Sequence, residues 1–137
     1  MNPYSNPRVL FVCIENAGRS QIARALFESM SDGFGEARSA GTSPARRVHP
    51  HVVAAMAARG SDLSNEIPKE LTVEGAEWAD LVVTMGCGDK CPVTGKPTED
   101  WNLPDPKAMN PEELGRVIDD IQARVADLLD RLSVVRA

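Results

Sequence analysis

Short apolar runs alternate with amphipathic, helix-like segments along most of this chain, and this alternation constrains the fold more than any other feature. Residues 8–14, RVLFVCI, are nearly continuous in apolar side chains, which predicts a strand buried on both faces of a parallel sheet. Further strands are expected at 36–41, 80–85 and 98–103, and helices at 20–30, at 50–58 and just after Thr72. We therefore expect one α/β domain over residues 1–137, with a four-stranded parallel sheet flanked by helices.

The last helix carries the clearest start signals of the chain. Asn110 is suited to the N-cap, Pro111 to the first helical position, and the two glutamates that follow to the positive end of the helix dipole. An apolar stripe then continues through Leu114, Val117, Ile118, Ile121, Val125, Leu128, Leu129 and Leu132. Such a stripe fits either a partner surface or a core, and core packing is the favoured interpretation.

The composition excludes several classes of function. The 137 residues carry a net charge of −5, which argues against a nucleic-acid partner, although a small anion can still bind at a local site. The apolar runs are too short for a membrane helix, and the first residues do not read as a secretory signal. Three cysteines, an odd number, favour a reducing compartment, so a cytoplasmic protein is expected.

The segment CIENAGRS, residues 13–20, links the first expected strand to the first expected helix. Such a connection aims backbone N–H groups and the positive end of the helix dipole at one point, where a tetrahedral oxyanion can bind. A thiol at Cys13 would share this field, which favours the nucleophilic thiolate. Arg19 could hold two oxyanion oxygens with its planar fork, and Ser20 could donate its hydroxyl to the sulfur.

The remaining positions of this loop fit the same function. Asn16 tolerates a positive φ and can brace the loop, and Gly18 allows a close approach of the backbone. The expected oxyanion-binding residues are Cys13, Ile14, Glu15, Asn16, Ala17, Gly18, Arg19 and Ser20. The alternative is a buried free cysteine that merely ends a strand, and the spacing to Arg19 and Ser20 argues against it. A nucleotide-binding P-loop is excluded, because its glycine–lysine motif does not occur.

Cys87 and Cys91 form a second constellation, in a glycine-rich loop after the strand expected at 80–85. Sites in open parallel sheets form beyond the carboxyl ends of the strands, so this loop should meet the Cys13 loop. A redox pair is favoured, because one thiolate of such a loop can attack the bonded sulfur of another. Two alternatives remain: half of a zinc site, with His49 and His51 among the few further candidate ligands, or two structural free cysteines.

Asp105, in WNLPDP, forms a third constellation after the last expected strand. A carboxylic acid near the nucleophile can protonate a departing oxyanion, and Pro106 biases Asp105 toward an extended conformation. On these residues alone a plain turn aspartate is favoured, and Asp100 is a weaker candidate acid. Trp101 is expected to pack beside this loop. His49 and His51, which flank a proline at a helix start, are expected to be solvated or to cap the helix.

These motifs together resemble a known family. VLFVCIENAGRSQIARALFE is similar to the signature of low-molecular-weight tyrosine phosphatases and of the arsenate reductases that share their fold. ADLVVTMGCGDKCP, EDWNLPDP, SAGTSP, VHPHVVAAM and PKELT resemble actinobacterial-type arsenate reductases, over residues 8–129. The resemblance implies the low-molecular-weight phosphatase fold. It assigns the nucleophile to Cys13, the oxyanion clamp to Arg19 and the thiolate-stabilising hydroxyl to Ser20. It also implies that Asn16 braces the loop and that Asp105 is the general acid.

Three features depart from the usual pattern of this family. Gly18 stands where many members have a second cysteine, and Glu15 stands where many have glycine. A carboxylate inside an anion-binding loop would repel the substrate, so we expect the Glu15 side chain to point outward. Cys87 and Cys91 are closer in sequence than the loop cysteines of the best-known thioredoxin-coupled members.

The resemblance implies reduction of arsenate to arsenite through a Cys13 adduct, with electrons from thiols, as in arsenic detoxification. Cys87 is the preferred second thiol and Cys91 its partner, with thioredoxin as reductant; an external small thiol such as mycothiol, with a glutaredoxin-like protein, is the alternative. Neither a bound cofactor nor a metal is expected. The rivals are a phosphotyrosine phosphatase, which the aromatic content of only 4% disfavours, and a non-catalytic anion- or zinc-binding module.

Overall fold

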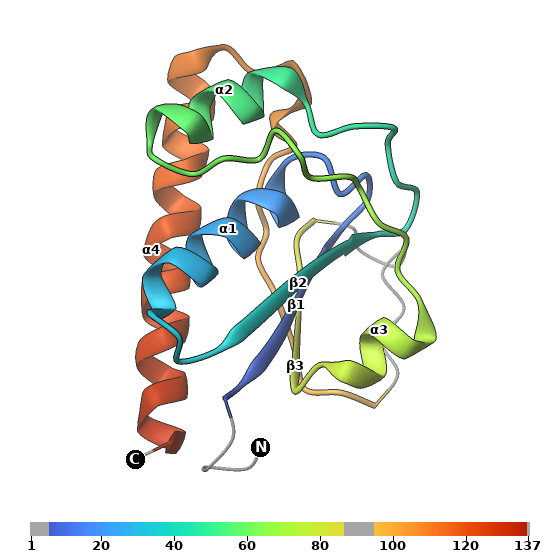
Figure 1. Ribbon diagram of the computed structural model, residues 1–137, viewed down its shortest axis with the longest axis vertical. Coiled ribbons are helices and arrows are strands. Elements are labelled where there is room, and N and C mark those ends of the chain that lie inside the picture. Colours follow the sequence, from blue (N-terminus) through green and yellow to red (C-terminus); the bar gives the residue numbers. More distant parts are fainter. Residues whose placement is uncertain (1–5, 87–94, 137) are drawn as a thin grey trace.

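The computed structural model describes residues 6–86 and 95–136 of the chain (Figure 1). The described strands are β1 (Arg8–Cys13), β2 (Glu36–Gly41), β3 (Leu81–Thr84) and β4 (Thr98–Asp100). The helices are α1 (Arg19–Ser31), α2 (Pro50–Ala58), α3 (Val73–Trp78) and α4 (Pro111–Arg136), with a short 3-10 turn, η2 (Pro106–Ala108). The strands form one parallel sheet in the order β2-β1-β3-β4, which confirms the expected α/β class and four-stranded sheet.

β1 lies in the middle of the sheet and sends alternate side chains into two cores. Val9, Phe11 and Cys13 belong to the larger core, which α1 and α4 cover. Leu10 and Val12 belong to the smaller core on the other face, where α3 lies (Figure 1). Each fully buried large apolar side chain contributes about 1.5–3 kcal/mol. Because both faces of β1 are anchored in this way, the position of its last residue, Cys13, is fixed.

α4 begins as the sequence predicts. Asn110 Oδ1 accepts from the Glu113 backbone N–H at 2.8 Å, and Glu113 Oε1 accepts from the Asn110 N–H at 3.1 Å, so the two side chains form a capping box. Every residue of the predicted apolar stripe is buried in the larger core or packed against it, so core packing is confirmed. Within the described ranges no helix, α4 included, combines the length and the apolarity that a membrane span requires.

Three predicted strands are shorter in the structure, and the one predicted at 80–85 spans only Leu81–Thr84. The strand predicted at 8–14 ends one residue early, because the carbonyl of Ile14 bonds to a loop outside the sheet. The strand predicted at 98–103 has only three residues. The Trp101 N–H still donates to the Thr84 carbonyl at 2.8 Å. Because β3 ends at Thr84, the residues after Trp101 have no strand to pair with and leave the sheet.

A paired carboxylate ties the edge strand to α4. Glu99 accepts two bonds from the guanidinium of Arg131, both at 2.9 Å, and a third from Trp101 Nε1 at 2.9 Å. The bonds from Arg131 are the main cause of the lowered pKa of Glu99, and partial burial opposes them. This pair therefore holds the carboxylate in its charged form and links β4 to the helix that covers the larger core.

The Arg131→Leu substitution is expected to lower the free energy of unfolding by about 1 kcal/mol at neutral pH. Because the pKa of Glu99 is lower in the folded state, the stabilisation is complete above its ordinary value of 4.5 and disappears as the pH falls through the folded value. Urea unfolding of both proteins from neutral pH to about pH 3 measures this difference. Arg116→Leu, which breaks a more exposed pair with Glu112, is the control and should change little. A loss that persists unchanged in acid would contradict the assignment.

Candidate active site

The Cys13 sulfur lies at the end of the central strand, next to polar groups of the loop that follows. Cys13 Sγ is 2.9 Å from Ser20 Oγ and accepts from the Asn16 backbone N–H at 3.2 Å. Ser20 Oγ in turn accepts from Asn16 Nδ2 at 2.7 Å, so its own hydrogen is free to point at the sulfur. Although Cys13 is only 2% exposed, its sulfur therefore has hydrogen-bonding partners in the loop that follows it.

Asn16 is the internal brace of the loop. Its φ is 52°, in the left-handed region that asparagine tolerates better than most residues. Its side-chain oxygen accepts from the Lys69 N–H at 2.9 Å and from Gln21 Nε2 at 3.1 Å. Both acceptor bonds fix the orientation of the amide, and so fix the bond from its nitrogen to Ser20. Asn16 thus links the loop conformation to the hydroxyl beside the sulfur.

The carbonyl groups of the loop point away from its centre. Those of Cys13, Ile14, Glu15 and Ala17 accept from backbone N–H groups of the 42–49 segment, at 2.8 to 3.2 Å. In a trans peptide the N–H points opposite to the C=O, so the N–H groups of these same peptide units turn toward the inside of the loop. The bond from the Asn16 N–H to the sulfur is one such case. The loop can therefore surround an oxyanion with donors.

Gly41, the last residue of β2, permits this packing. A Cβ at this position would lie 2.6 Å from the Ile14 carbonyl oxygen and 2.9 Å from the Asn16 nitrogen. Both atoms belong to the backbone of the loop, so a side chain would have to displace the loop itself.

Gly41→Ala is expected to destabilise the protein by about 1–3 kcal/mol and to reduce the catalytic efficiency at least tenfold. Unfolding curves and steady-state kinetics at a temperature where both proteins are folded separate the two effects. Gly115→Ala is the matched control, because a Cβ there would make only an ordinary 3.8 Å contact with Arg59 and alanine favours the helix. Full activity of the Gly41 variant would show that the loop does not need this close approach.

The segments that follow β1, β3 and β4 meet at the side chain of Arg19. Its guanidinium is buried, and Nη1 donates to the Leu103 carbonyl at 3.0 Å, in the segment after β4. Gly86, just after β3, has a φ of 78°, and a Cβ there would lie 2.5 Å from Arg19 Nη1. The segments that follow β1, β3 and β4 therefore converge on this side chain, as the parallel topology requires. Sequence reasoning missed Gly86; its place just beyond the end of a parallel strand was the available signal.

Asp105 lies on the turn that packs against this loop. Its Oδ1 accepts from the Lys107 N–H at 3.0 Å, which caps η2 and leaves the carboxyl group exposed. Pro106 is buried against Gly18, where a Cβ would lie 2.8 Å from the proline ring. The weaker candidate acid, Asp100, instead accepts from the Thr84 hydroxyl at 2.6 Å within the sheet. The geometry therefore favours Asp105 over Asp100 as a proton donor.

The packing role expected for Trp101 is confirmed. Its ring is 4% exposed, and its centroid lies 5.7 Å from that of Phe11, so the indole belongs to the larger core. The segment that leads to Asp105 is therefore anchored in the interior.

The expectation for the two histidines was only partly right, because both are half-buried and contact residues outside their helix. His49 is the N-cap residue of α2, but its side chain forms no capping bond and lies 3.5 Å from Glu15 Oε2. Burial is the main cause of the lowered pKa of His49, and the nearby Glu15 carboxylate opposes it. His51 Nε2 is 2.7 Å from the Pro106 carbonyl. Sequence spacing gave no signal of these contacts, which join residues far apart in the chain.

Glu15 turns its carboxylate to the rim of the loop. Its Oε1 accepts from Lys107 Nζ at 3.2 Å, whereas its other oxygen, Oε2, is the one that lies near His49. The Glu15 side chain is 29% exposed. Because His49 has a lowered pKa, the positive charge that balances Glu15 at neutral pH comes from Lys107. A carboxylate paired in this way repels an anion less than a free one would.

Cys87 and Cys91 lie outside the described residues, so their expected roles stay predictions. Within the ranges 6–86 and 95–136, the side chains of His, Cys, Asp and Glu form no group of three or more that could hold a metal ion.

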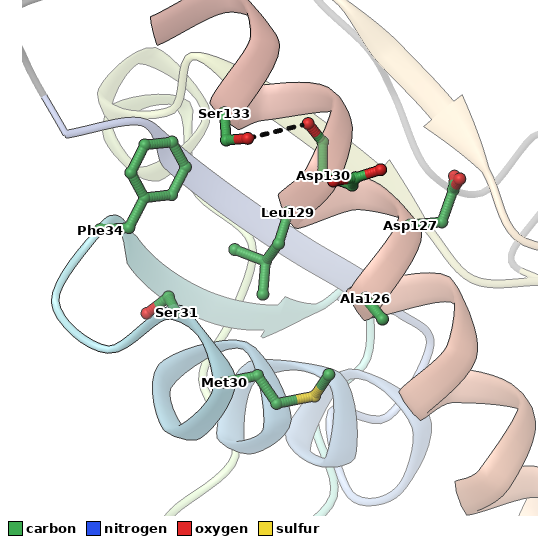
Figure 2. A pocket seen from close by; sticks show the side chains of 8 residues that line it. All are labelled: Met30, Ser31, Phe34, Ala126, Asp127, Leu129, Asp130 and Ser133. Atoms are coloured by element: carbon green, nitrogen blue, oxygen red, sulfur yellow. Dashed lines mark hydrogen bonds between the residues drawn. The ribbon is translucent and has the colours of Figure 1, made fainter. Parts of the chain in front are cut away.

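A groove of about 700 Å³ lies at the other end of α1, between this helix and α4 (Figure 2). Figure 2 shows Met30, Phe34 and Leu129 along it, with Asp127 and Asp130 nearby. A helix of 13 residues is about 20 Å long, so this groove is far from Cys13, which contacts Ser20 in the first turn of α1. It is separate from the candidate active site.

Comparisons with known proteins show the family of this chain. The low molecular weight phosphotyrosine protein phosphatase family matches residues 8–136. A protein of Halobacterium salinarum is 36% identical over 140 residues, which cover 97% of this chain and 98% of that relative. The glutaredoxin arsenate reductase of Synechocystis is 32% identical, over 92% of this chain and 98% of its own length.

A solved structure gives the same result. The thioredoxin-dependent arsenate reductase of Corynebacterium glutamicum superimposes with a TM-score of 0.78 and is 40% identical to this chain. The match covers 93% of this chain but 62% of that one, so the two proteins differ in length.

Proposed function

We propose that this chain, which belongs to the low molecular weight phosphotyrosine protein phosphatase family, reduces arsenate to arsenite with electrons taken from thiols. The observation that carries the proposal is the Cys13 sulfur, hydrogen-bonded in a loop that can surround an oxyanion with donors, in a chain with arsenate reductases among the relatives that it matches over nearly their whole length. We propose further that residues 1–137 act as one catalytic domain in a reducing, cytoplasmic compartment, without a bound cofactor.

In the first step, arsenate binds in the loop 13–20 through backbone N–H groups and Arg19. The Cys13 thiolate, stabilised by Ser20, attacks arsenic and forms a sulfur–arsenic bond. The bond from arsenic to one oxygen breaks, and Asp105 supplies the proton with which that oxygen leaves as water or hydroxide. The exposed carboxyl group of Asp105, on a turn packed against the loop, supports this role.

In the second step, another thiolate attacks the Cys13 sulfur. A disulfide forms, the sulfur–arsenic bond breaks, and its electron pair stays with arsenic, which leaves as arsenite. The two electrons thus come from two thiols. We propose Cys87 as the attacking thiol, with a Cys87–Cys91 disulfide formed next and reduced by thioredoxin. An external thiol such as mycothiol, with a glutaredoxin-like protein, is the alternative donor.

A coupled assay tests the function and the donor together. NADPH oxidation that depends on arsenate is expected with thioredoxin and its reductase, and Cys87→Ser is expected to reduce it at least about 100-fold. The variant should still bind arsenate, measured as a rise in melting temperature, because Cys87 is not part of the binding loop. Activity of Cys87→Ser only with mycothiol and a glutaredoxin-like protein would assign the external route. Hydrolysis of a phosphotyrosine analogue, without arsenate reduction by either donor, would support the phosphatase alternative.

A further inference from the structure

Four polar side chains from three separate segments meet at the rim of the candidate site: Glu15, His49, His51 and Lys107, called here the rim cluster. Glu15 contacts Lys107 at 3.2 Å and His49 at 3.5 Å. The rings of His49 and His51 stack with centroids 5.7 Å apart. The cluster therefore joins the loop after β1, the start of α2 and the turn that carries Asp105.

His51 forms the most direct link to the Asp105 turn. A carbonyl oxygen can only accept, so the 2.7 Å contact requires that His51 Nε2 carries a proton and donates it to the Pro106 carbonyl. The same carbonyl accepts from the Met109 N–H at 3.1 Å, which closes η2. η2 is also the turn that Asp105 caps through the Lys107 N–H. His51 therefore bonds to the turn that fixes the Asp105 carboxyl group.

The Glu15–Lys107 pair adds a second link to the same turn, from the nucleophile loop itself. Lys107 lies two positions after Asp105, and Glu15 lies two positions after Cys13. The pair thus connects the segment of the nucleophile with the segment of the acid. A general acid must reach the leaving oxygen within hydrogen-bond distance, and a displacement of about 1 Å can cost about 100-fold in rate.

We propose that His51 and the Glu15–Lys107 pair are positioning residues, which hold the Asp105 turn against the nucleophile loop so that the acid reaches the leaving oxygen. The inference rests on the proposed function, in which Asp105 is the general acid. Glutamine can replace the Nε2–H donor of His51, whereas alanine cannot.

His51→Ala is expected to lower kcat for arsenate reduction about tenfold and to leave KM for arsenate within about twofold, because the anion-binding loop is intact. His51→Gln is expected to restore most of kcat. Lys107→Met is expected to lower kcat about threefold. The matched control is Arg116→Met, which removes one positive charge from the exposed pair with Glu112 and should leave kcat unchanged.

Coupling with Asp105 separates positioning from a general loss of folding. In an Asp105→Asn background, His51→Ala should cost less than about twofold, because the group that it positions is already gone. A full tenfold loss in that background would overturn the proposal, since His51 would then act on something other than Asp105.

Hydrogen exchange gives a test that does not depend on activity. In His51→Ala the amides of Lys107 and Met109 should exchange at least about tenfold faster than in the wild type, and in His51→Gln and Arg116→Met they should not. Unchanged exchange together with unchanged kcat in His51→Ala would overturn the proposal. If the wild-type protein does not reduce arsenate, the proposed function is wrong, and exchange alone decides whether His51 holds the turn.

Discussion

Replacing Cys13 with serine is expected to lower arsenate reduction to background, a loss of at least about 10⁴-fold. A serine hydroxyl is a much weaker nucleophile than a thiolate at neutral pH. An oxygen–arsenic ester also offers no sulfur for the second thiol to attack, so no disulfide can form and no electron pair can pass to arsenic. The measurement is arsenite release and arsenate-dependent NADPH oxidation in the coupled assay.

The control for this prediction is binding without chemistry. The backbone N–H groups of the loop and Arg19 are the proposed donors to arsenate, and Cys13→Ser leaves them in place, so this variant should still gain melting temperature when arsenate is added. Arsenite production by a correctly folded Cys13→Ser protein would show that another residue is the nucleophile.

Arg19→Lys is expected to reduce kcat/KM for arsenate by about 10²- to 10³-fold. Lysine keeps the positive charge but loses the planar fork that can bind two oxyanion oxygens at once. It also loses the geometry with which Nη1 reaches the Leu103 carbonyl, so the segments after β1 and β4 are held less firmly together. Steady-state kinetics over a range of arsenate concentrations measures the loss.

Arg24→Lys is the matched control, because Arg24 lies on the same helix and is mostly buried, but it pairs with Glu28 and Glu66. It should retain catalytic efficiency within about threefold. Equal losses in the two variants would mean that any arginine-to-lysine change in α1 disturbs the fold, and would remove the special role of Arg19.

Local patterns were sufficient to predict the elements of the fold. The apolar run through Val9 and Phe11 predicted a doubly buried strand, and Asn110 with Pro111 predicted the start of α4, because these signals depend on neighbours in sequence. The end of β4 was predicted less well. The chain leaves the sheet at Trp101 because β3 ends at Thr84, and these two residues are far apart in sequence.

The candidate site, like the fold, could be predicted only where its contacts are local in sequence. The contact of Cys13 with Ser20 lies within one strand–loop–helix unit, so the spacing of the residues was enough to suggest it. The link from His51 to Pro106 and the pairing of Glu15 with Lys107 join distant segments. Such contacts follow from the packing of whole elements, and a single sequence carries no local signal for them.

A single-turnover experiment shows whether the electrons that reduce arsenate pass through Cys13. The reduced protein is mixed with arsenate in the absence of any reducing system, and the thiols and the released arsenite are measured together by mass spectrometry and arsenic speciation. If Cys13 carries the reaction, one arsenite is expected for each disulfide formed and none from Cys13→Ser, and a trapped arsenic adduct on Cys13 is expected when the second thiol is withheld. Arsenite that accumulates while Cys13 can still be alkylated as a free thiol, in a protein that has formed no disulfide, would contradict this role of Cys13.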